Sequence, residues 1–201
     1  VRSRRQRQMC IRDRFKALLA TQAGSTISTQ VVDLSDQDLM AGDVTVAVEF
    51  STVNYKDALA ISGRSPVIRQ FPLIPGIDFA GVVEASTYPG LVAGDRVLAN
   101  GWGLSQTHHG GYAQRARVSG DWLIKVPEAF STRQAMAIGT AGYTAMLSVL
   151  ALEHGGLTPE RGDILVTGAN GGAGSVAIAL LSSLGYRAVS YTHLTLPTTP
   201  Y

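Results

Sequence analysis

The 201-residue sequence contains a single cysteine, Cys10, and its charged fraction is only 16%. One cysteine excludes an intrachain disulfide framework and a multi-cysteine zinc site. The low charge content excludes a solvated, disordered chain. No apolar run reaches the roughly 18 residues that a membrane-spanning helix needs, so we expect no membrane partner. The length then allows one large domain or two small ones, each with a hydrophobic core.

The basic residues behind the formal net charge of +2 are gathered at one end of the sequence. Six of the 17 Lys and Arg residues lie within positions 1–14, where Asp13 alone opposes them. Such a basic arm is typical of a nucleic-acid-binding tail or of an Arg-rich transit peptide. Residues 189–201, in contrast, contain no Asp, Glu, Lys or Arg.

The two ends are related to each other through their codons. Residues 4–13 (RRQRQMCIRD) can be encoded by a DNA string whose reverse complement translates as VSYTHLTLPT, the sequence of residues 189–198. This relation resembles a sequencing adapter left on both ends of a DNA fragment and translated with it. We therefore interpret 1–14 and 189–201 as adapter artefacts, which are excluded from fold reasoning. The alternative, a genuine basic arm, requires the complementarity to be coincidence.

The remaining residues, 15–188, are then expected to be an internal piece of a longer protein. They hold 11 Lys and Arg (17 minus 6) against 14 Asp and Glu (15 minus 1), a formal charge of −3. Without the arm, the sequence lacks the basic patch of a nucleic-acid-binding protein, so we expect no nucleic-acid partner.

Residues 15–127 consist of short apolar stretches separated by Gly and Pro turns. Val44, Val46, Val48 and Phe50 recur at every second position, which is the spacing of a half-buried strand. Many short strands with such turns predict a small β barrel or a distorted sandwich. Further strands are expected at 15–20, 77–83, 96–99, 115–118 and 122–126, with a short helix at 54–62.

From residue 128 onward the pattern changes to helices around a buried strand. Helices are predicted at 131–138 and at 140–152, the second apolar on most faces. Residues 164–167 form a continuous apolar run typical of a parallel strand covered on both faces. A glycine-rich turn and a helix at 175–184 follow it. We therefore predict an α/β domain over 128–188 that is truncated after its first βα unit.

Residues 169–174 (ANGGAG) fit A-x-G-x-x-G, a variant of the dinucleotide-binding fingerprint. Gly171 lets the backbone approach a pyrophosphate, and Gly174 lets the helix pack closely on the strand. The helix N-terminus offers free N–H groups to the phosphates. A flexible turn is the alternative, but the flanking strand and helix favour the cofactor. The predicted cofactor-binding residues are Asn170, Gly171, Gly172, Ala173, Gly174 and Ser175.

Five stretches of the sequence are long enough to be compared with known families: VNYKDALAISGRSPVIRQFPLIPGIDFAG (53–81), NGWG (100–103), GGYAQRARVSGDWL (110–123), AMAIGTAGYTAML (135–147) and TGANGGAGSVA (167–177). Together they resemble the zinc-independent acrylyl-CoA reductase branch of the medium-chain dehydrogenase/reductase superfamily, close to the quinone oxidoreductases. The resemblance covers essentially all of 15–188 and implies a β-rich GroES-like barrel domain followed by an α/β Rossmann domain.

The resemblance also implies residues for the active site. It brings Tyr55 to the nicotinamide and the substrate as a cofactor contact or a proton donor; a core aromatic residue is the alternative. Asn54 and Asp57 flank the same turn and are predicted as catalytic, or as structural because Asn and Asp fix turns. Thr140 and Thr144 match positions that lie near the nicotinamide in members of the family. The alternative is that they have structural roles only, as a helix N-cap and a buried hydroxyl.

No metal is expected, because the sequence outside the adapter ends has no cysteine. Asp78 stands where zinc-dependent relatives have a His-Glu pair. His108 and His109 are predicted to lie on a surface or cleft-rim loop. Arg64 and Arg69 are candidates for the phosphates of a CoA substrate, with a solvated loop as the alternative.

The resemblance predicts NADPH-dependent reduction of the C=C bond of a short α,β-unsaturated acyl-CoA, acrylyl-CoA to propanoyl-CoA, by hydride transfer. NADH stays open as the cofactor, and NADPH:quinone or enone oxidoreduction is the alternative activity. A non-catalytic nucleotide- or RNA-binding module is the alternative of another class, because some zinc-free relatives are lens crystallins or bind RNA. The piece could also be an inactive fragment. We expect an acyl-CoA or quinone substrate, a homodimeric parent and a cytoplasmic location.

Overall fold

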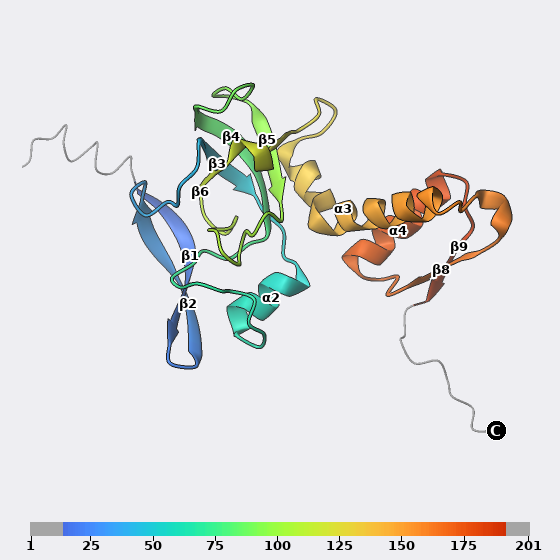
Figure 1. The fold of residues 1–201 in the computed structure, drawn as a ribbon, viewed down its shortest axis with the longest axis horizontal. Coiled ribbons are helices and arrows are strands. Elements are labelled where there is room, and N and C mark those ends of the chain that lie inside the picture. The colour runs from blue at the N-terminus through green and yellow to red at the C-terminus, as the bar shows by residue number, and fades with distance from the viewer. Residues whose placement is uncertain (1–13, 192–201) are drawn as a thin grey trace, which may run out of the picture. The chain divides into compact units, whose positions relative to one another are not determined.

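The computed structural model describes residues 14–191, so most of the two predicted adapter segments lies outside the described residues. The chain divides into two compact units, with unit 1 ending at Gly139 and unit 2 beginning at Thr140 (Figure 1). The change from a β-rich to an α/β pattern was predicted after residue 127, and the helix that follows this point begins in unit 1 and continues into unit 2.

Unit 1 is built on an antiparallel five-stranded sheet and a separate two-stranded hairpin. The alternation of apolar residues seen in the sequence is the alternation of burial: Val44 and Val46 are fully buried and pack with Phe79, Val97 and Val118. The hairpin consists of β1 (Arg14–Ala23) and β2 (Thr26–Ser35). The sheet has the order β6-β3-β4-β5-β7, with β3 (Val44–Phe50), β4 (Asp78–Ser86), β5 (Arg96–Asn100), β6 (Arg115–Val118) and β7 (Ile124–Lys125), and the helix α2 (Tyr55–Ser62) lies between β3 and β4 in the chain.

The hairpin is attached to loops that lie far along the sequence. The Leu18 N–H donates to the Tyr112 carbonyl at 2.8 Å, and the Gln114 N–H donates to the Lys16 carbonyl at 2.9 Å. β2 was not predicted from the sequence, because its polar residues leave most of its positions exposed or only half-buried. Pairing with β1 over its whole length, rather than an apolar face of its own, holds it in place.

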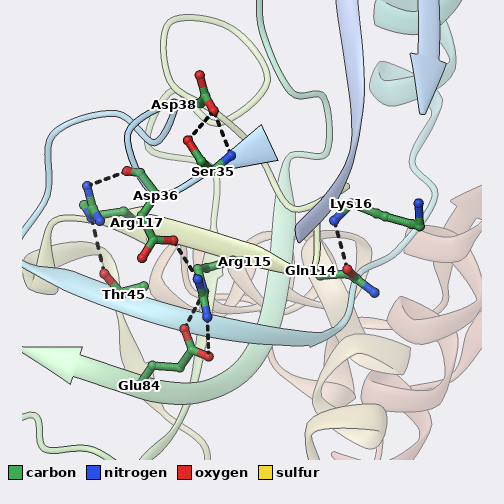
Figure 2. Close-up of polar contacts among 9 residues, drawn as sticks. All are labelled: Lys16, Ser35, Asp36, Asp38, Thr45, Glu84, Gln114, Arg115 and Arg117. Carbon is green, nitrogen blue, oxygen red and sulfur yellow. Dashed lines mark hydrogen bonds and ion pairs between the residues drawn. The ribbon is translucent and has the colours of Figure 1, made fainter. Parts of the chain in front are cut away.

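A charged cluster joins the end of the hairpin to the sheet. Figure 2 shows Arg115 of β6 between two carboxylates: its Nη1 lies 2.6 Å from Asp36 Oδ1, and its Nε lies 2.6 Å from Glu84 Oε2. The Arg115 side chain is only 19% exposed. Hydrogen bonding to Glu84, and then to Asp36, raises the pKa of the guanidinium. A carboxylate in the turn after β2 and a carboxylate of β4 therefore fix this cation.

The helix α3 (Thr132–His154) contains a break at Gly139. This residue has φ 52° and ψ −161°, a conformation that only glycine adopts without strain. The two helices predicted from the sequence are therefore one element divided by this residue. The prediction that no apolar run has the length of a membrane span is wrong for α3, which is long enough and has a mean hydropathy of 1.6. A third of that apolar stretch is buried within the structure.

Unit 2 is a strand–turn–helix–strand arrangement. β8 and β9 pair in parallel, with Ile164 beside Ala188 and Thr167 beside Tyr191. Its core is formed by Val149 of α3, Leu181 and Tyr186. A cavity of about 270 Å³ lies between α3, β8 and the helix that follows the glycine-rich turn. The elements are β8 (Ile164–Thr167), α4 (Gly172–Ser183) and β9 (Ala188–Tyr191), the last of which takes in residues 189–191.

Candidate functional site

Tyr55 is the first residue of α2 and is 81% exposed. Asn54, with extended backbone (φ −103°, ψ 158°), is the N-cap of this helix. Asp57, in the first turn, accepts a hydrogen bond from the Asn54 N–H at 2.9 Å. The alternative of a core aromatic residue is therefore wrong for Tyr55, whose side chain stands free at a well-anchored helix start.

Two fully buried carboxylates, Asp57 and Asp78, form hydrogen bonds with residues 52–54, the turn before Tyr55. Asp57 Oδ1 accepts from the Ile77 N–H at 3.0 Å. Asp78 Oδ1 accepts from the Thr52 hydroxyl at 2.6 Å and from the Thr52 N–H at 3.2 Å. The Asn54 Nδ2 lies 3.1 Å from Asp57 Oδ2 and 3.2 Å from Asp78 Oδ2, so one amide group bridges both carboxylates.

Burial is the main cause of the unusual electrostatics of this network. It raises the pKa of Asp57, against hydrogen bonds from Asn54 and Ile77 that lower it, and the nearby charge of Asp78 raises it further. Burial also raises the pKa of Tyr112, whose hydroxyl donates to the Thr52 carbonyl at 2.9 Å. The structure thus supports the structural alternative for Asp57, which positions the turn. Direct participation of Asn54 and Asp57 in catalysis stays a prediction.

The fingerprint turn has the geometry that the sequence predicted. Gly171 is the N-cap of α4 and offers no side chain to the helix start, so the N–H groups of the first turn are without intrahelical partners. A Cβ on Gly174 would collide with the Gly168 carbonyl, and a Cβ on Gly172 would lie 3.0 Å from Ala141 Cβ. Glycine is therefore needed at position 174 for α4 to approach the strand end, whereas a side chain at position 172 would require Ala141 to shift by a few tenths of an ångström.

The other predicted cofactor residues lie in the same unit. Asn170, Ala173 and Ser175 are exposed, and the Ser175 hydroxyl donates to the carbonyl of the first helical residue at 3.2 Å. Thr144 is exposed and donates to the Thr140 carbonyl at 2.8 Å, so it is not the buried hydroxyl considered as an alternative. Thr140 is half-buried and follows the break in α3. The structure thus brings the fingerprint and both threonines together in unit 2.

The surface position predicted for the histidine pair is wrong for His108. This residue is 8% exposed, and its ring meets the Trp122 ring edge-on with centroids 5.0 Å apart. His109 Nδ1 accepts from the Ile74 N–H at 3.3 Å, and burial lowers the pKa of His109. Within residues 14–191, no three His, Cys, Asp or Glu side chains are grouped so that they could hold a metal.

Sequence reasoning missed Thr52 and Tyr112. It considered Asp78 only as the residue that stands where zinc-dependent relatives have a His-Glu pair. A possible signal was the position of Asp78 at the start of an apolar strand, where a carboxylate needs partners to be buried. Its partners come from residues 51–54, which the sequence pattern does not place beside it.

The barrel strands, the fingerprint turn and the connecting helix define a medium-chain dehydrogenase/reductase, the superfamily to which the chain belongs. Residues 40–128 match the alcohol dehydrogenase GroES-like domain family. The chain is 54% identical over 173 residues to the probable acrylyl-CoA reductase AcuI of Escherichia coli, covering 86% of this chain and 53% of that protein. It is 43% identical over 178 residues to the putative quinone oxidoreductase YhfP of Bacillus subtilis, covering 89% and 54%.

Solved structures confirm the predicted fold class, a GroES-like barrel followed by a Rossmann portion. The yhdH oxidoreductase of Salmonella enterica, solved with NADP, superposes with a TM-score of 0.85 at 54% identity, covering 87% of this chain and 54% of that one. Bacillus subtilis yhfP, solved with NAD, gives 0.85 at 43% identity, covering 88% and 54%. The chain therefore spans about half the length of the relatives that it matches.

Proposed function

We propose that the complete protein is an NADPH-dependent oxidoreductase that reduces the C=C bond of a short α,β-unsaturated acyl-CoA, converting acrylyl-CoA to propanoyl-CoA. The observation that carries the nucleotide part is the open N-terminus of α4 behind a turn packed through Gly172 and Gly174. The substrate follows from the name of the Escherichia coli relative.

The residues of unit 2 fit a dinucleotide. The N–H groups of Gly172, Ala173 and Gly174 begin the helix, where unpaired donors and the helix dipole favour a phosphate. The absence of side chains at Gly171 and Gly172 leaves the backbone accessible, and both residues are exposed. These residues would hold the pyrophosphate. When bound, NADPH would supply the hydride for the β-carbon of the C=C bond.

The residues of unit 1 suit the other half of the reaction. The exposed hydroxyl of Tyr55 is available to orient the nicotinamide or to give a proton to the α-carbon of the substrate. Its helix start is fixed by the network of Asn54, Asp57 and Asp78, so the hydroxyl is presented from a preorganised support. No metal takes part in this proposal.

Reduction of quinones or enones is the second candidate, because the Bacillus subtilis relative is named a putative quinone oxidoreductase and was solved with NAD. The same fingerprint serves either nucleotide, since the residue that selects between NAD and NADP lies about 20 positions beyond the turn. Homodimer formation and a cytoplasmic location remain predictions, as does the absence of nucleic-acid binding.

The test is an assay of the complete protein from its source locus. Oxidation of NADPH and of NADH is followed with acrylyl-CoA and, separately, with a benzoquinone and an enone. The proposal expects NADPH to be oxidised fastest with acrylyl-CoA. A Gly174→Val variant should lose nucleotide binding, because a side chain at position 174 collides with the Gly168 carbonyl. Ala151→Val, at an exposed position of α3, is the control. Rapid quinone reduction without acrylyl-CoA reduction would refute the proposal in favour of the second candidate.

A further inference from the structure

Trp102 presents an aromatic ring to solvent on a rigid support. It is 61% exposed, and its ring stacks on the Trp122 ring with centroids 6.4 Å apart and planes at 5°. Trp122 packs against the main core of unit 1 and is braced edge-on by His108. The Trp102 ring is therefore supported on one face and open on the other, which is the arrangement of a stacking platform.

The backbone at Trp102 is strained. Its φ is +54°, between Gly101 at +81° and Gly103 at +83°. A bulky residue in this region is unusual, and strain of this kind is concentrated at binding and catalytic sites. Glycine at position 102 would relieve the strain, and the largely exposed ring contributes little to the core. The fold alone therefore gives no reason for tryptophan at this position.

The strained loop starts beside the network that supports Tyr55. The Gly101 N–H donates to the Ile77 carbonyl at 2.9 Å, and the Ile77 N–H donates to Asp57 Oδ1. The Trp102 loop is thus connected to the helix start that presents Tyr55 through two hydrogen bonds of the Ile77 backbone, one to Gly101 and one to the Asp57 carboxylate. The platform belongs to the same end of the barrel domain as the proposed reacting groups.

An unpaired cation lies next to the same loop. The Arg69 N–H donates to the Gln106 carbonyl at 2.9 Å, and the Gln70 side chain bonds to the Thr107 carbonyl. The Arg69 side chain is exposed, and within the described part of the chain it forms no ion pair. A guanidinium in this position is free to bind a phosphate.

We propose that Trp102 and Arg69 form the binding site for the adenosine end of a CoA substrate, the adenine ring stacking on Trp102 and a phosphate bonding to Arg69. This inference rests on the acyl-CoA function proposed above and extends it to the recognition of the carrier group. A quinone ring is also flat and could stack on tryptophan, but it has no phosphate for Arg69. The combination of ring and cation therefore favours CoA.

The 201-residue chain offers a direct test, because Trp102 and Trp122 are its only two tryptophans. A proton–nitrogen NMR spectrum shows one indole N–H signal for each, and a Trp102→Phe variant identifies which is which. The chain is titrated with CoA, with adenosine and with a benzoquinone. The proposal expects saturable shifts of the Trp102 signal with CoA, weaker shifts with adenosine and none with the quinone.

Variants separate the two contacts. Trp102→Ala should weaken CoA and adenosine binding by about tenfold, the typical effect of losing one base–aromatic stack. Arg69→Ala should weaken CoA binding and leave adenosine binding unchanged, while Arg161→Ala, at another exposed arginine, should change neither. Dispersed backbone amide signals of unit 1 in each variant show that this unit is still folded, since the Trp122 signal itself shifts when its stacked neighbour is removed. Trp102→Gly should bind as weakly as Trp102→Ala without loss of thermal stability.

Binding of CoA that leaves the Trp102 signal unmoved, or that survives in both Trp102→Ala and Arg69→Ala, would overturn the proposal. A quinone-induced shift without a CoA-induced shift would also overturn it. The assay of the complete protein distinguishes this failure from failure of the proposed function. Reduction of acrylyl-CoA by a protein whose Trp102 ignores CoA would refute the site alone.

Discussion

Replacement of Asp57 by alanine tests whether the buried network is the main support of the Tyr55 turn. The carboxylate accepts from the Ile77 N–H at 3.0 Å and from the Asn54 N–H at 2.9 Å. Loss of an acceptor for the buried Ile77 N–H costs about 1–3 kcal/mol, and loss of the helix-start contact adds about 1 kcal/mol. Removal of a poorly solvated carboxylate offsets part of this sum. We expect unit 1 to lose about 2–4 kcal/mol of unfolding free energy.

The assay is urea unfolding followed by tryptophan fluorescence, which reports on unit 1 because Trp102 and Trp122 both precede Gly139. Asp33→Ala is the matched control. The Asp33 side chain is 53% exposed in its ion pair with Lys16, so this variant should change stability by no more than about 0.5 kcal/mol. Equal losses in the two aspartate variants would refute the assignment of Asp57 as the support of the turn.

Three further predictions concern the same region. Burial raises the pKa of Asp57 in the folded state above its ordinary 3.8, so ionisation of this carboxyl opposes folding. The unfolding free energy should therefore fall as the pH rises from 3.8 through the raised pKa. Asp57→Asn should lack this pH-dependent loss, and identical pH profiles of unfolding free energy in the variant and the wild type would contradict the prediction. Gly139→Ala should lower the unfolding free energy by about 1–3 kcal/mol in a thermal unfolding experiment, because residue 139 has a φ of 52° and its added Cβ would lie 3.0 Å from Thr52 Cγ2. Gly155→Ala, at a glycine without a positive φ, is the control and should lower it by less than about 1 kcal/mol. Tyr55→Phe should unfold like the wild type, since the residue is 81% exposed, yet slow NADPH oxidation by the complete protein about tenfold or more; unchanged turnover would exclude a role for the hydroxyl.

Sequence reasoning succeeded where the determining pattern is local. β3 and β8 were predicted with their observed bounds, because a run of alternating or continuous apolar residues is a local signal. The prediction that β8 is covered on both faces is wrong within the described residues, where Leu165 is 63% exposed. The fingerprint turn was predicted because the strand, the turn and the helix follow one another within about 20 residues, so a single short motif contains all three elements. Gly174 could be given its packing role before its contact with Gly168 was known.

Sequence reasoning failed where the position of a residue or strand depends on partners that are distant in the chain. β2 has no buried face of its own, and its place depends on β1. The burial of His108 depends on Trp122, and the meeting of Asp57 with Ile77 joins residues 20 positions apart. The strained backbone of the exposed Trp102 could not be predicted either, because no sequence pattern indicates a positive φ at a residue other than glycine.

The attachment of the N-terminal hairpin to residues 112–114 determines how early unit 1 can complete its folding during synthesis. The Lys16 N–H bonds to the Gln114 side chain, 98 residues further along the chain, and Val44 pairs with Val118. The hairpin can pair internally, but its attachment to the rest of unit 1 must wait until residues 112–114 have left the ribosome. Long-range pairing of this kind also slows folding. Unit 2 closes its parallel pair over a much shorter stretch, from Ile164 to Ala188. The first residues of unit 1 thus depend on partners that are made almost 100 residues later in the same unit.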